Sequence, residues 1–402
     1  MKIKLVKLFA ASALFAGLLA GCGAGDSGSG SSSSGSGSSG GGGGDTIKIG
    51  LNLELSGAVA SYGTGINQGV ELAVEEINAA GGVDGKQIQL IPVDNKSDGQ
   101  EATNGAIKLT DKDKVVAIIG AATSGNTIAQ VEIANNNKTV LITPSGTSMV
   151  VTVNEKGKLN EYAFRTTFID PFQGTVAANF ALNELGVKTA AVYGDNASDY
   201  AKGLGAAFIE TFEAAGGKIV AQESYIAKDT DFRSTLTRIK SADPEFVYIP
   251  GYYEEVGLIV KQARELGIEA PLMGGDGWDS PTLVELAGAG ALNNTFVTAA
   301  YAAEDPDPMI QNFVKAFTEK HGEAPDGFSA LGYDTVYLLK DAIERAGSVD
   351  SVKIKEALEQ TKDFPLVTGA LTIDENHNPI KAATILEFVD GQMKFNSKVN
   401  PE

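Results

Sequence analysis

Two loops rich in hydroxyl groups and glycine follow short apolar runs in the first half of the chain. One loop contains Ala122 and Ser124, and the other contains Ser145 and Thr147. Each loop precedes a predicted helix, and the backbone N–H groups at a helix start attract a carboxylate, to which nearby hydroxyls add further donors. Serine and threonine are also ordinary N-caps, so each loop taken alone fits either role.

A carboxylate and several aromatic rings follow other apolar runs. Asp276 lies in a Gly-rich loop, where it can either face an ammonium group or serve as a turn residue. Tyr200 and Tyr253 lie after two further predicted strands, and a tyrosine there can bond an amine, wall a pocket or pack in the core. Trp278, the only tryptophan, can likewise either wall a pocket or pack in the core. A donor cluster, a carboxylate and an aromatic wall together form the complement of an α-amino acid.

Few residues in the chain are suited to catalysis. The two histidines, His321 and His377, occupy positions typical of solvated turns. Cys22 is the only cysteine, which excludes an intrachain disulfide and a cysteine-based metal site, and no cluster has metal-ligand spacing. We therefore expect no enzymatic activity, no cofactor and no bound metal.

The N-terminus is typical of an exported lipoprotein. Three lysines precede an almost wholly apolar run over residues 8–20, which is short for a membrane span but suits a signal peptide. Residues 19–22 resemble the bacterial lipobox, in which Cys22 receives the lipid. We expect a signal peptide over residues 1–21, and a lipidated cysteine with a flexible Gly/Ser-rich linker over residues 22–44.

Composition limits the possible partners of the chain. The sequence has 32 basic and 51 acidic residues, a balance that argues against binding to nucleic acid or to anionic lipid. No other segment approaches 18 consecutive apolar residues, so we expect the lipid to be the only membrane contact.

The body of the chain alternates between strand and helix patterns. Residues 46–53 alternate as in a strand, and apolar residues then recur at helical spacing over residues 66–77. Repeated βα units predict parallel sheets covered by helices on both faces, and the body is too long for one core, which predicts two lobes. Residues 385–395 predict a β-hairpin with a turn at Asp390–Gly391.

Seven stretches of the body resemble the branched-chain amino acid binding proteins of ABC importers. The resemblance runs from about Thr46 to the C-terminus. The stretches are Ser56–Gly57, Tyr62–Gly63, Ile77–Gly85, Pro144–Thr147, Asp195–Gly203, Pro250–Tyr253 and Gly274–Gly277.

This resemblance implies an α/β, two-lobe Venus-flytrap fold, the type I periplasmic binding protein fold. Each lobe would be a doubly wound, mostly parallel sheet flanked by helices, and the chain would cross between lobes three times. The first lobe would comprise residues 45–167 and 299–368, and the second residues 168–298 and 369–402. The crossings would lie near Thr166–Thr167, Val297–Ala299 and Thr368–Gly369.

The resemblance also implies roles for the candidate residues. The ligand carboxylate would be held by Ser124 and Thr147, with backbone groups of Ala122 and Ser145. The ammonium would be held by Asp276 and Tyr200. The ligand side chain would lie against Tyr62, Tyr253 and Trp278. Asp276 stands where many relatives carry Glu, so the shorter carboxylate requires a shift of the lobe or of the ligand.

These expectations describe a monomeric, lipid-anchored solute-binding protein that closes around leucine, isoleucine or valine and passes it to an ABC permease. The long tether suits the outer face of a Gram-positive membrane, with a periplasmic lipoprotein as the alternative. A second hypothesis keeps the fold and changes the solute to urea, an amide, an aromatic acid or another amino acid, for uptake or sensing. An extracellular hydrolase and an adhesive lipoprotein are the remaining hypotheses.

Overall fold

The computed structural model describes residues 46–400, all of which belong to one compact unit of the chain. The predicted signal peptide, the predicted lipid site at Cys22 and the Gly/Ser-rich linker lie outside the described residues. Within residues 46–400, no helix combines the length and the apolar character needed to cross a membrane.

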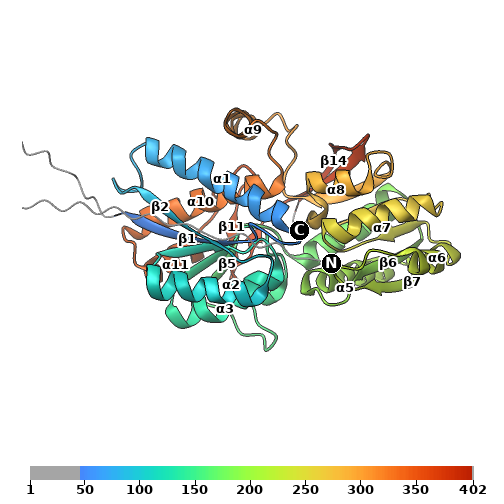
Figure 1. The fold of residues 1–402 in the computed structure, drawn as a ribbon, viewed down its shortest axis with the longest axis horizontal. Helices are drawn as coiled ribbons and strands as arrows, with labels where there is room; N and C mark the ends of the chain where they lie inside the picture. Colours follow the sequence, from blue (N-terminus) through green and yellow to red (C-terminus); the bar gives the residue numbers. More distant parts are fainter. Residues whose placement is uncertain (1–45, 401–402) are drawn as a thin grey trace, which may run out of the picture. The chain divides into compact units, whose positions relative to one another are not determined.

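A five-stranded, all-parallel sheet organises the first lobe, with the strand order β2-β1-β3-β4-β5. Figure 1 labels β1, β2 and β5 of this sheet. Neighbouring residues on one strand pack into different clusters, since Ile119 belongs to one apolar cluster and Ile118 to another. Both faces of the sheet are therefore buried, as expected for parallel strands. The strands are β1 (Ile47–Leu53), β2 (Ile88–Asp94), β3 (Ala117–Gly120), β4 (Val140–Thr143) and β5 (Ala163–Arg165).

Helices cover both faces of this sheet. The cluster around Ile119 includes side chains of α1, α10 and α11, and the cluster around Ile118 includes side chains of α2 and α3. A further helix, α9, packs against α1 through a third apolar cluster. The bounds are α1 (Ala60–Ala79), α2 (Gly99–Ile107), α3 (Ser124–Asn137), α9 (Pro308–His321), α10 (Gly327–Ala346) and α11 (Ser351–Glu359).

Helices α1 and α10 lie side by side with their backbones in close approach (Figure 1). A Cβ atom added to Gly69 of α1 would lie 1.9 Å from the carbonyl oxygen of Ser329, and one added to Gly332 of α10 would lie 2.4 Å from that of Ile66. Only glycine fits at these two positions, so the sequence sets the distance between the two helices.

A seven-stranded sheet organises the second lobe, with the order β14-β13-β10-β9-β8-β6-β7. The five strands from β6 to β10 are parallel to one another, whereas β13 and β14 form an antiparallel hairpin that pairs with β10. The predicted hairpin is thus confirmed. The strands are β6 (Thr189–Asp195), β7 (Lys218–Tyr225), β8 (Phe246–Tyr248), β9 (Leu272–Gly274), β10 (Thr295–Ala299), β13 (Ala383–Val389) and β14 (Gln392–Val399).

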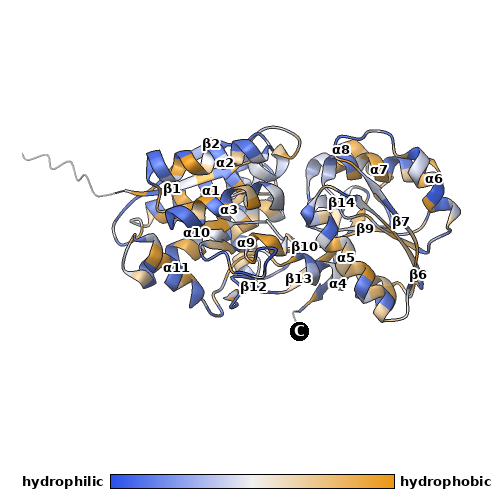
Figure 2. Ribbon diagram, turned by 90° about the horizontal axis from the view of Figure 1, so that it is seen from below, coloured by the Kyte–Doolittle hydropathy of each residue, from blue (hydrophilic) through white to orange (hydrophobic). Residues whose placement is uncertain are grey.

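The second sheet is also covered on both faces. Side chains of α4 and α5 pack into one cluster, and side chains of α6, α7 and α8 pack into another. Figure 2 shows these helices carrying both hydrophobic and hydrophilic residues, as expected for helices half-covered by a sheet. The bounds are α4 (Asp170–Asn179), α5 (Asp199–Ala214), α6 (Arg233–Ser241), α7 (Tyr253–Glu265) and α8 (Pro281–Ala287). Short helical turns η1 to η4 span Lys108–Asp113, Met149–Val151, Phe180–Glu184 and Asp276–Trp278.

The chain passes between the lobes three times. It leaves the first sheet after Arg165 and reaches α4 of the second lobe at Asp170. It leaves the second sheet after Ala299, and Tyr301 already packs against α9 of the first lobe. It returns to the second sheet at Ala383. This arrangement of two α/β lobes and three crossings is the predicted fold.

The position of the third crossing corrects the expectation of Thr368–Gly369. Residues 371–380, which include the short pair β11 (Thr372–Ile373) and β12 (Pro379–Ile380), pack on the first lobe. The ring of His377 stacks on Phe164 of β5 with 4.0 Å between ring centroids. His377 is 1% exposed, so its interpretation as a solvated turn residue is also wrong.

Candidate functional site

A small, tightly closed cavity of about 10 Å³ lies between loops of the two lobes. The loops follow the carboxyl ends of β1, β3 and β4 in the first lobe, and of β6, β8 and β9 in the second. Such strand ends are where doubly wound sheets bind ligands. The lining residues are Tyr62, Ala122, Thr123, Ser124, Ser145 and Phe328 of the first lobe, and Tyr200, Tyr252, Asp276 and Gly277 of the second.

Hydrogen-bond donors occupy the first-lobe wall of the cavity. Ser124 is the first residue of α3, and its Oγ accepts a hydrogen bond from the Ser148 N–H over 3.1 Å, which leaves its own hydroxyl hydrogen free to donate. The N–H groups of the first helical turn have no acceptor within the helix. Ser145 Oγ donates to the carbonyl of Ala122 over 2.7 Å, so this hydroxyl joins the two loops.

Glu54 follows β1 and is bonded directly to the start of α3. Its carboxylate accepts from the N–H of Ala122 over 2.8 Å, and from the N–H and hydroxyl of Thr123 over 3.0 and 2.8 Å. The side-chain amide of Asn126 donates to the same carboxylate over 2.9 Å, and Glu54 has no exposed surface. The N–H of Ala122 is therefore already paired, and Ala122 lines the cavity without the donor role expected of its backbone.

Arg165 positions the loop that carries Ser145. This side chain has no exposed surface and donates to the carbonyls of Gly146 and Ser148, each over 2.7 Å. Burial lowers the pKa of Arg165 to about 10, and the nearby Asp170 carboxylate opposes that shift. A guanidinium buried among carbonyls holds both ends of the short loop in one conformation.

Thr147 lies behind the cavity wall instead of in it. It has no exposed surface, its carbonyl accepts from the N–H of Asp170, and it is not among the lining residues. Its hydroxyl lies beside the buried Asp170 carboxyl, whose pKa is raised well above the ordinary value by burial. The structure therefore places Thr147 outside the lining residues, and its expected contact with a ligand carboxylate stays a prediction.

Asp276 provides a carboxylate on the second-lobe wall. Its Oδ1 accepts from the hydroxyl of Tyr200 and from the side-chain amide of Gln173, each over 2.9 Å. Burial raises the pKa of Asp276 to about 6, against the opposing effect of these two bonds. Both bonds end on Oδ1, so Oδ2 remains available as an acceptor, and the group is mostly ionised at pH 7.

Aromatic rings complete the cavity wall. Tyr62 stacks on Phe328 with 4.2 Å between ring centroids, and Tyr200 stacks on Tyr252 with 5.1 Å between centroids. Tyr62 also meets Tyr252 edge to face at 5.9 Å. The rings surround the space between Ser124 and Asp276 with apolar carbon, which suits an aliphatic group.

Two of the expected pocket residues have other roles. Tyr253 bonds across the lobes, since its hydroxyl donates to the carbonyl of Ala58 over 3.0 Å and its N–H donates to the hydroxyl of Tyr62 over 3.2 Å. Trp278 has no exposed surface and its Nε1 donates to the carbonyl of Ile249 over 3.0 Å, within the core of the second lobe. Neither residue lines the cavity.

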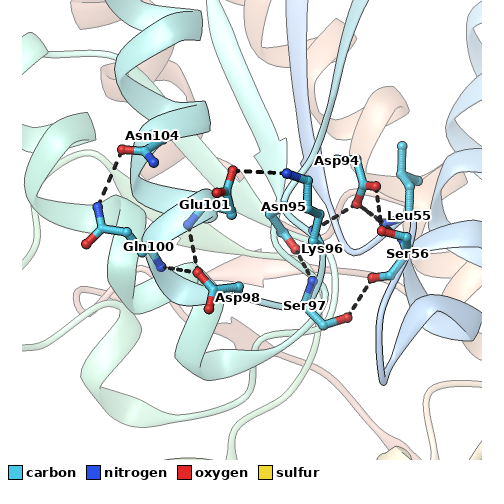
Figure 3. Close-up of polar contacts among 10 residues, drawn as sticks. All are labelled: Leu55, Ser56, Asp94, Asn95, Lys96, Ser97, Asp98, Gln100, Glu101 and Asn104. Carbon is cyan, nitrogen blue, oxygen red and sulfur yellow. Dashed lines mark hydrogen bonds and ion pairs between the residues drawn. The ribbon is translucent and has the colours of Figure 1, made fainter.

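A polar network holds the loop that leads into α1 (Figure 3). Asp94 accepts from the N–H groups of Leu55 and Ser56 over 3.1 Å, and from the Ser56 hydroxyl over 2.6 Å. Burial alone would raise the pKa of Asp94, but these bonds outweigh it and lower the pKa. Ser97 Oγ donates to the carbonyl of Ser56 over 2.8 Å. The network fixes the segment that presents Ala58 to the second lobe.

Sequence reasoning did not assign several residues of the site, among them Glu54, Phe328 and Tyr252. Glu54 gave no signal, because its partners lie far along the chain. Phe328 stands at the start of a helix that the sequence places outside the candidate loops. Tyr252 lines the cavity, whereas the resemblance implies that role for its neighbour Tyr253. Within residues 46–400, no group of three or more metal-ligating side chains is gathered.

Comparison with known proteins identifies the family. The family model for periplasmic binding proteins matches residues 46–392. The Leu-, Ile-, Val-, Thr- and Ala-binding protein of Pseudomonas aeruginosa is 34% identical over 82% of this chain and 86% of its own length. The Leu/Ile/Val-binding protein BraC3 of Rhizobium johnstonii is 32% identical over 82% of this chain and 88% of its own length.

Solved structures give the same result. The branched-chain amino acid transporter substrate-binding protein LivJ of Streptococcus pneumoniae, in complex with isoleucine, is 41% identical with a TM-score of 0.83, over 89% of this chain and 100% of its own. The leucine-binding protein LivK of Thermotoga maritima is 37% identical with a TM-score of 0.84, over 89% of this chain and 99% of its own. Members of this family are extracytoplasmic solute-binding proteins of ABC importers. The chain belongs to the periplasmic binding protein family.

Proposed function

We propose that this protein binds an aliphatic α-amino acid, with leucine, isoleucine and valine as the first candidates, and delivers it to the permease of an ABC importer. The observation that carries the proposal is that one cavity is lined by the donors around Ser124, by the carboxylate of Asp276 and by aromatic rings.

The two ends of the cavity match the two charges of an amino acid. The hydroxyl of Ser124 and the free N–H groups at the start of α3 bind the ligand carboxylate. Asp276 and the hydroxyl of Tyr200 bind the ammonium, and the rings of Tyr62, Tyr252 and Phe328 contact the aliphatic side chain. A solute that lacks either charge leaves buried polar groups unpaired, which costs several kcal/mol and makes the site selective for zwitterions.

The proposal extends to the parts of the chain outside the described residues. Cys22 carries the lipid after removal of residues 1–21, and residues 23–44 tether the body to the outer face of a Gram-positive membrane. The protein acts as a monomer without a cofactor and performs no chemical step on its ligand. Its partners are the permease subunits of an importer and, through the lipid, the membrane.

An alternative is a related solute on the same fold. A solute-binding protein of Rhodopseudomonas palustris in complex with benzoate is 26% identical to this chain with a TM-score of 0.78, over 89% of this chain and 97% of its own.

Calorimetric titration separates the two candidates. Residues 45–402, freed of copurified solute by unfolding and refolding, are titrated with leucine, isoleucine, valine, alanine, phenylalanine, urea and benzoate. We expect tight binding of an aliphatic amino acid, and loss of at least about tenfold in affinity in Asp276→Ala, because the ammonium then lacks its counter-charge. Affinity should also fall as the pH is lowered through about 6, where Asp276 becomes protonated.

Two variants sharpen the comparison. Asp276→Asn keeps the size of the side chain and removes its charge, so it should also weaken binding and abolish the loss of affinity below pH 6. Glu285→Gln removes an exposed carboxylate elsewhere in the second lobe and should leave the affinity unchanged. Binding of urea or benzoate that is equally tight in Asp276→Ala would contradict the amino acid proposal and leave the fold assignment intact.

A further inference from the structure

Three residues beyond Asp276, a second carboxyl group of the same loop contacts the opposite lobe. Asp279 Oδ2 accepts a hydrogen bond from the N–H of Gly327, the first residue of α10, over 2.9 Å. A Cβ atom added to Gly327 would lie 2.5 Å from this oxygen, so glycine is needed for the approach. Asp279 is 4% exposed, which means that the contact is closed to solvent.

Within residues 46–400, the charged groups that act on Asp279 are acidic. Among the described residues, Asp279 Oδ1 is buried without a hydrogen-bond partner. The carboxyl of Asp326 lies next to Gly327 in the chain and is itself bonded to the N–H and hydroxyl of Ser329, each over 2.7 Å. The charge of Asp276 also acts on Asp279, and the charge of Glu323 acts on Asp326. The hydroxyl of the nearby Tyr301 is already paired, because it donates to the carbonyl of Pro325. Closure therefore brings like charges together.

We propose that Asp279 is a latch that docks on the first turn of α10 when the lobes close, and that it docks as a neutral acid because it is buried there beside the carboxyl group of Asp326. This inference rests on the proposed function, since it concerns closure around the solute. The latch is a positioning residue, because it lies outside the cavity lining and acts on the lobes.

The protonation of the latch follows from electrostatics. Burial, followed by the charge of Asp326, raises the pKa of Asp279 to about 8 in the closed form. In an open form the carboxyl group is hydrated and separated from Asp326, so its pKa returns toward the ordinary value of about 4. Closing at pH 7 thus takes up close to one proton, and the affinity for the solute falls as the pH rises toward 8.

Neighbouring bonds restrict where the latch can dock. The hydroxyls of Ser61 in the first lobe and Ser280 in the second lie 2.8 Å apart. Ser280 directly follows Asp279 in the chain. The Tyr62 hydroxyl donates to the carbonyl of Gly277, the residue that follows Asp276 in the chain. Both of these bonds join groups that are uncharged at pH 7, so Asp279 is the carboxyl group in this set of inter-lobe contacts.

The proton is measured by calorimetry of solute binding at pH 7 in phosphate and in Tris, whose ionisation enthalpies differ. We expect uptake of about one proton per bound solute in the unmodified protein and of none in Asp279→Asn, which retains an oxygen for the Gly327 N–H. Between pH 6.5 and 8 the affinity of the unmodified protein should fall by roughly tenfold or more, and that of Asp279→Asn should stay constant. Glu285→Gln, which removes an exposed acid of the nearby helix α8, should behave as the unmodified protein.

Equal proton uptake by the unmodified protein and Asp279→Asn would overturn the proposal. If no solute of the panel binds, the proposed function fails while the latch remains open to a direct test. Spin labels on Lys112→Cys and Glu213→Cys, two exposed positions in different lobes, report the distance between the lobes. The latch predicts that the closed population of the unliganded protein decreases from pH 6.5 to 8.5, and that Asp279→Asn shows no such change. An identical response of both proteins would contradict it.

Discussion

Glu54 is the residue on which the geometry of the donor wall depends. Its carboxylate accepts from two N–H groups, a hydroxyl and an amide at the start of α3, with no exposed surface. We predict that Glu54→Ala destabilises the protein by about 3 kcal/mol, because it leaves several buried donors unpaired. Glu54→Gln should be destabilising too, since an amide nitrogen in place of Oε2 directs its hydrogens against the N–H of Ala122. Urea denaturation measures both free energies of unfolding.

Glu132→Gln is the matched control, because Glu132 is an exposed carboxylate on the same helix. It should change the free energy of unfolding by less than about 0.5 kcal/mol. Solute affinity of Glu54→Gln should fall along with stability, as the first turn of α3 loses its fixed position. A Glu54→Ala protein as stable as the unmodified one would show that water replaces the carboxylate and that Glu54 does not position the site.

Individual site residues were predictable where the sequence places them at strand ends. Ser124, Ser145, Tyr200 and Asp276 lie there, and the structure brings them around one cavity. Side-chain direction was not predictable, because neighbouring loop residues point to different surroundings. Trp278 therefore turns into the core two residues after Asp276, a choice that depends on packing partners elsewhere in the chain.

At the scale of elements, the contact between α1 and α10 sets the shape of the first lobe. We predict that Gly69→Ala destabilises the protein by about 1–2 kcal/mol, because the new methyl group meets the carbonyl of Ser329 and the helices must separate. The gain in helix propensity, up to about 1 kcal/mol, offsets only part of this cost. Chemical denaturation provides the measurement.

Gly99→Ala provides the comparison for that substitution. Gly99 begins α2, and a Cβ atom there would lie 3.8 Å from the nearest side-chain carbon, which is ordinary contact. The substitution should be neutral or stabilising by up to about 1 kcal/mol. Equal effects of the two substitutions would mean that the helices can move apart at no cost and that the close approach does not stabilise the lobe.

The order and type of the elements were predictable, but their assignment to lobes was less so. Alternating βα patterns and the C-terminal hairpin were visible in the sequence. The third crossing was misplaced because residues 371–380 form only short strands, and local pattern does not state which sheet such a segment packs on. The stacking of His377 on Phe164 settles that question, and it joins residues more than two hundred positions apart.

At the scale of the whole molecule, the two lobes share a continuous apolar cluster. Tyr62 and Phe328 of the first lobe belong to the same cluster as Tyr253 and Trp278 of the second. Hydrogen bonds from Tyr253 to Ala58 and from Tyr62 to Gly277 cross the same boundary. Each such hydrogen bond contributes only about 1 kcal/mol net, and a bound solute adds further contacts across the same boundary.

A bound solute should therefore couple the unfolding of the two lobes. At a concentration 100 times its dissociation constant, a solute that binds only the closed, folded protein adds about 2.7 kcal/mol to the free energy of unfolding. We predict a single, shifted calorimetric transition with leucine or the best solute of the panel, and a smaller shift in Asp276→Ala at the same concentration. Because the cavity takes its walls from both lobes, a solute that shifts only one of two separate transitions would show that it binds one lobe alone, and closure around it would be excluded.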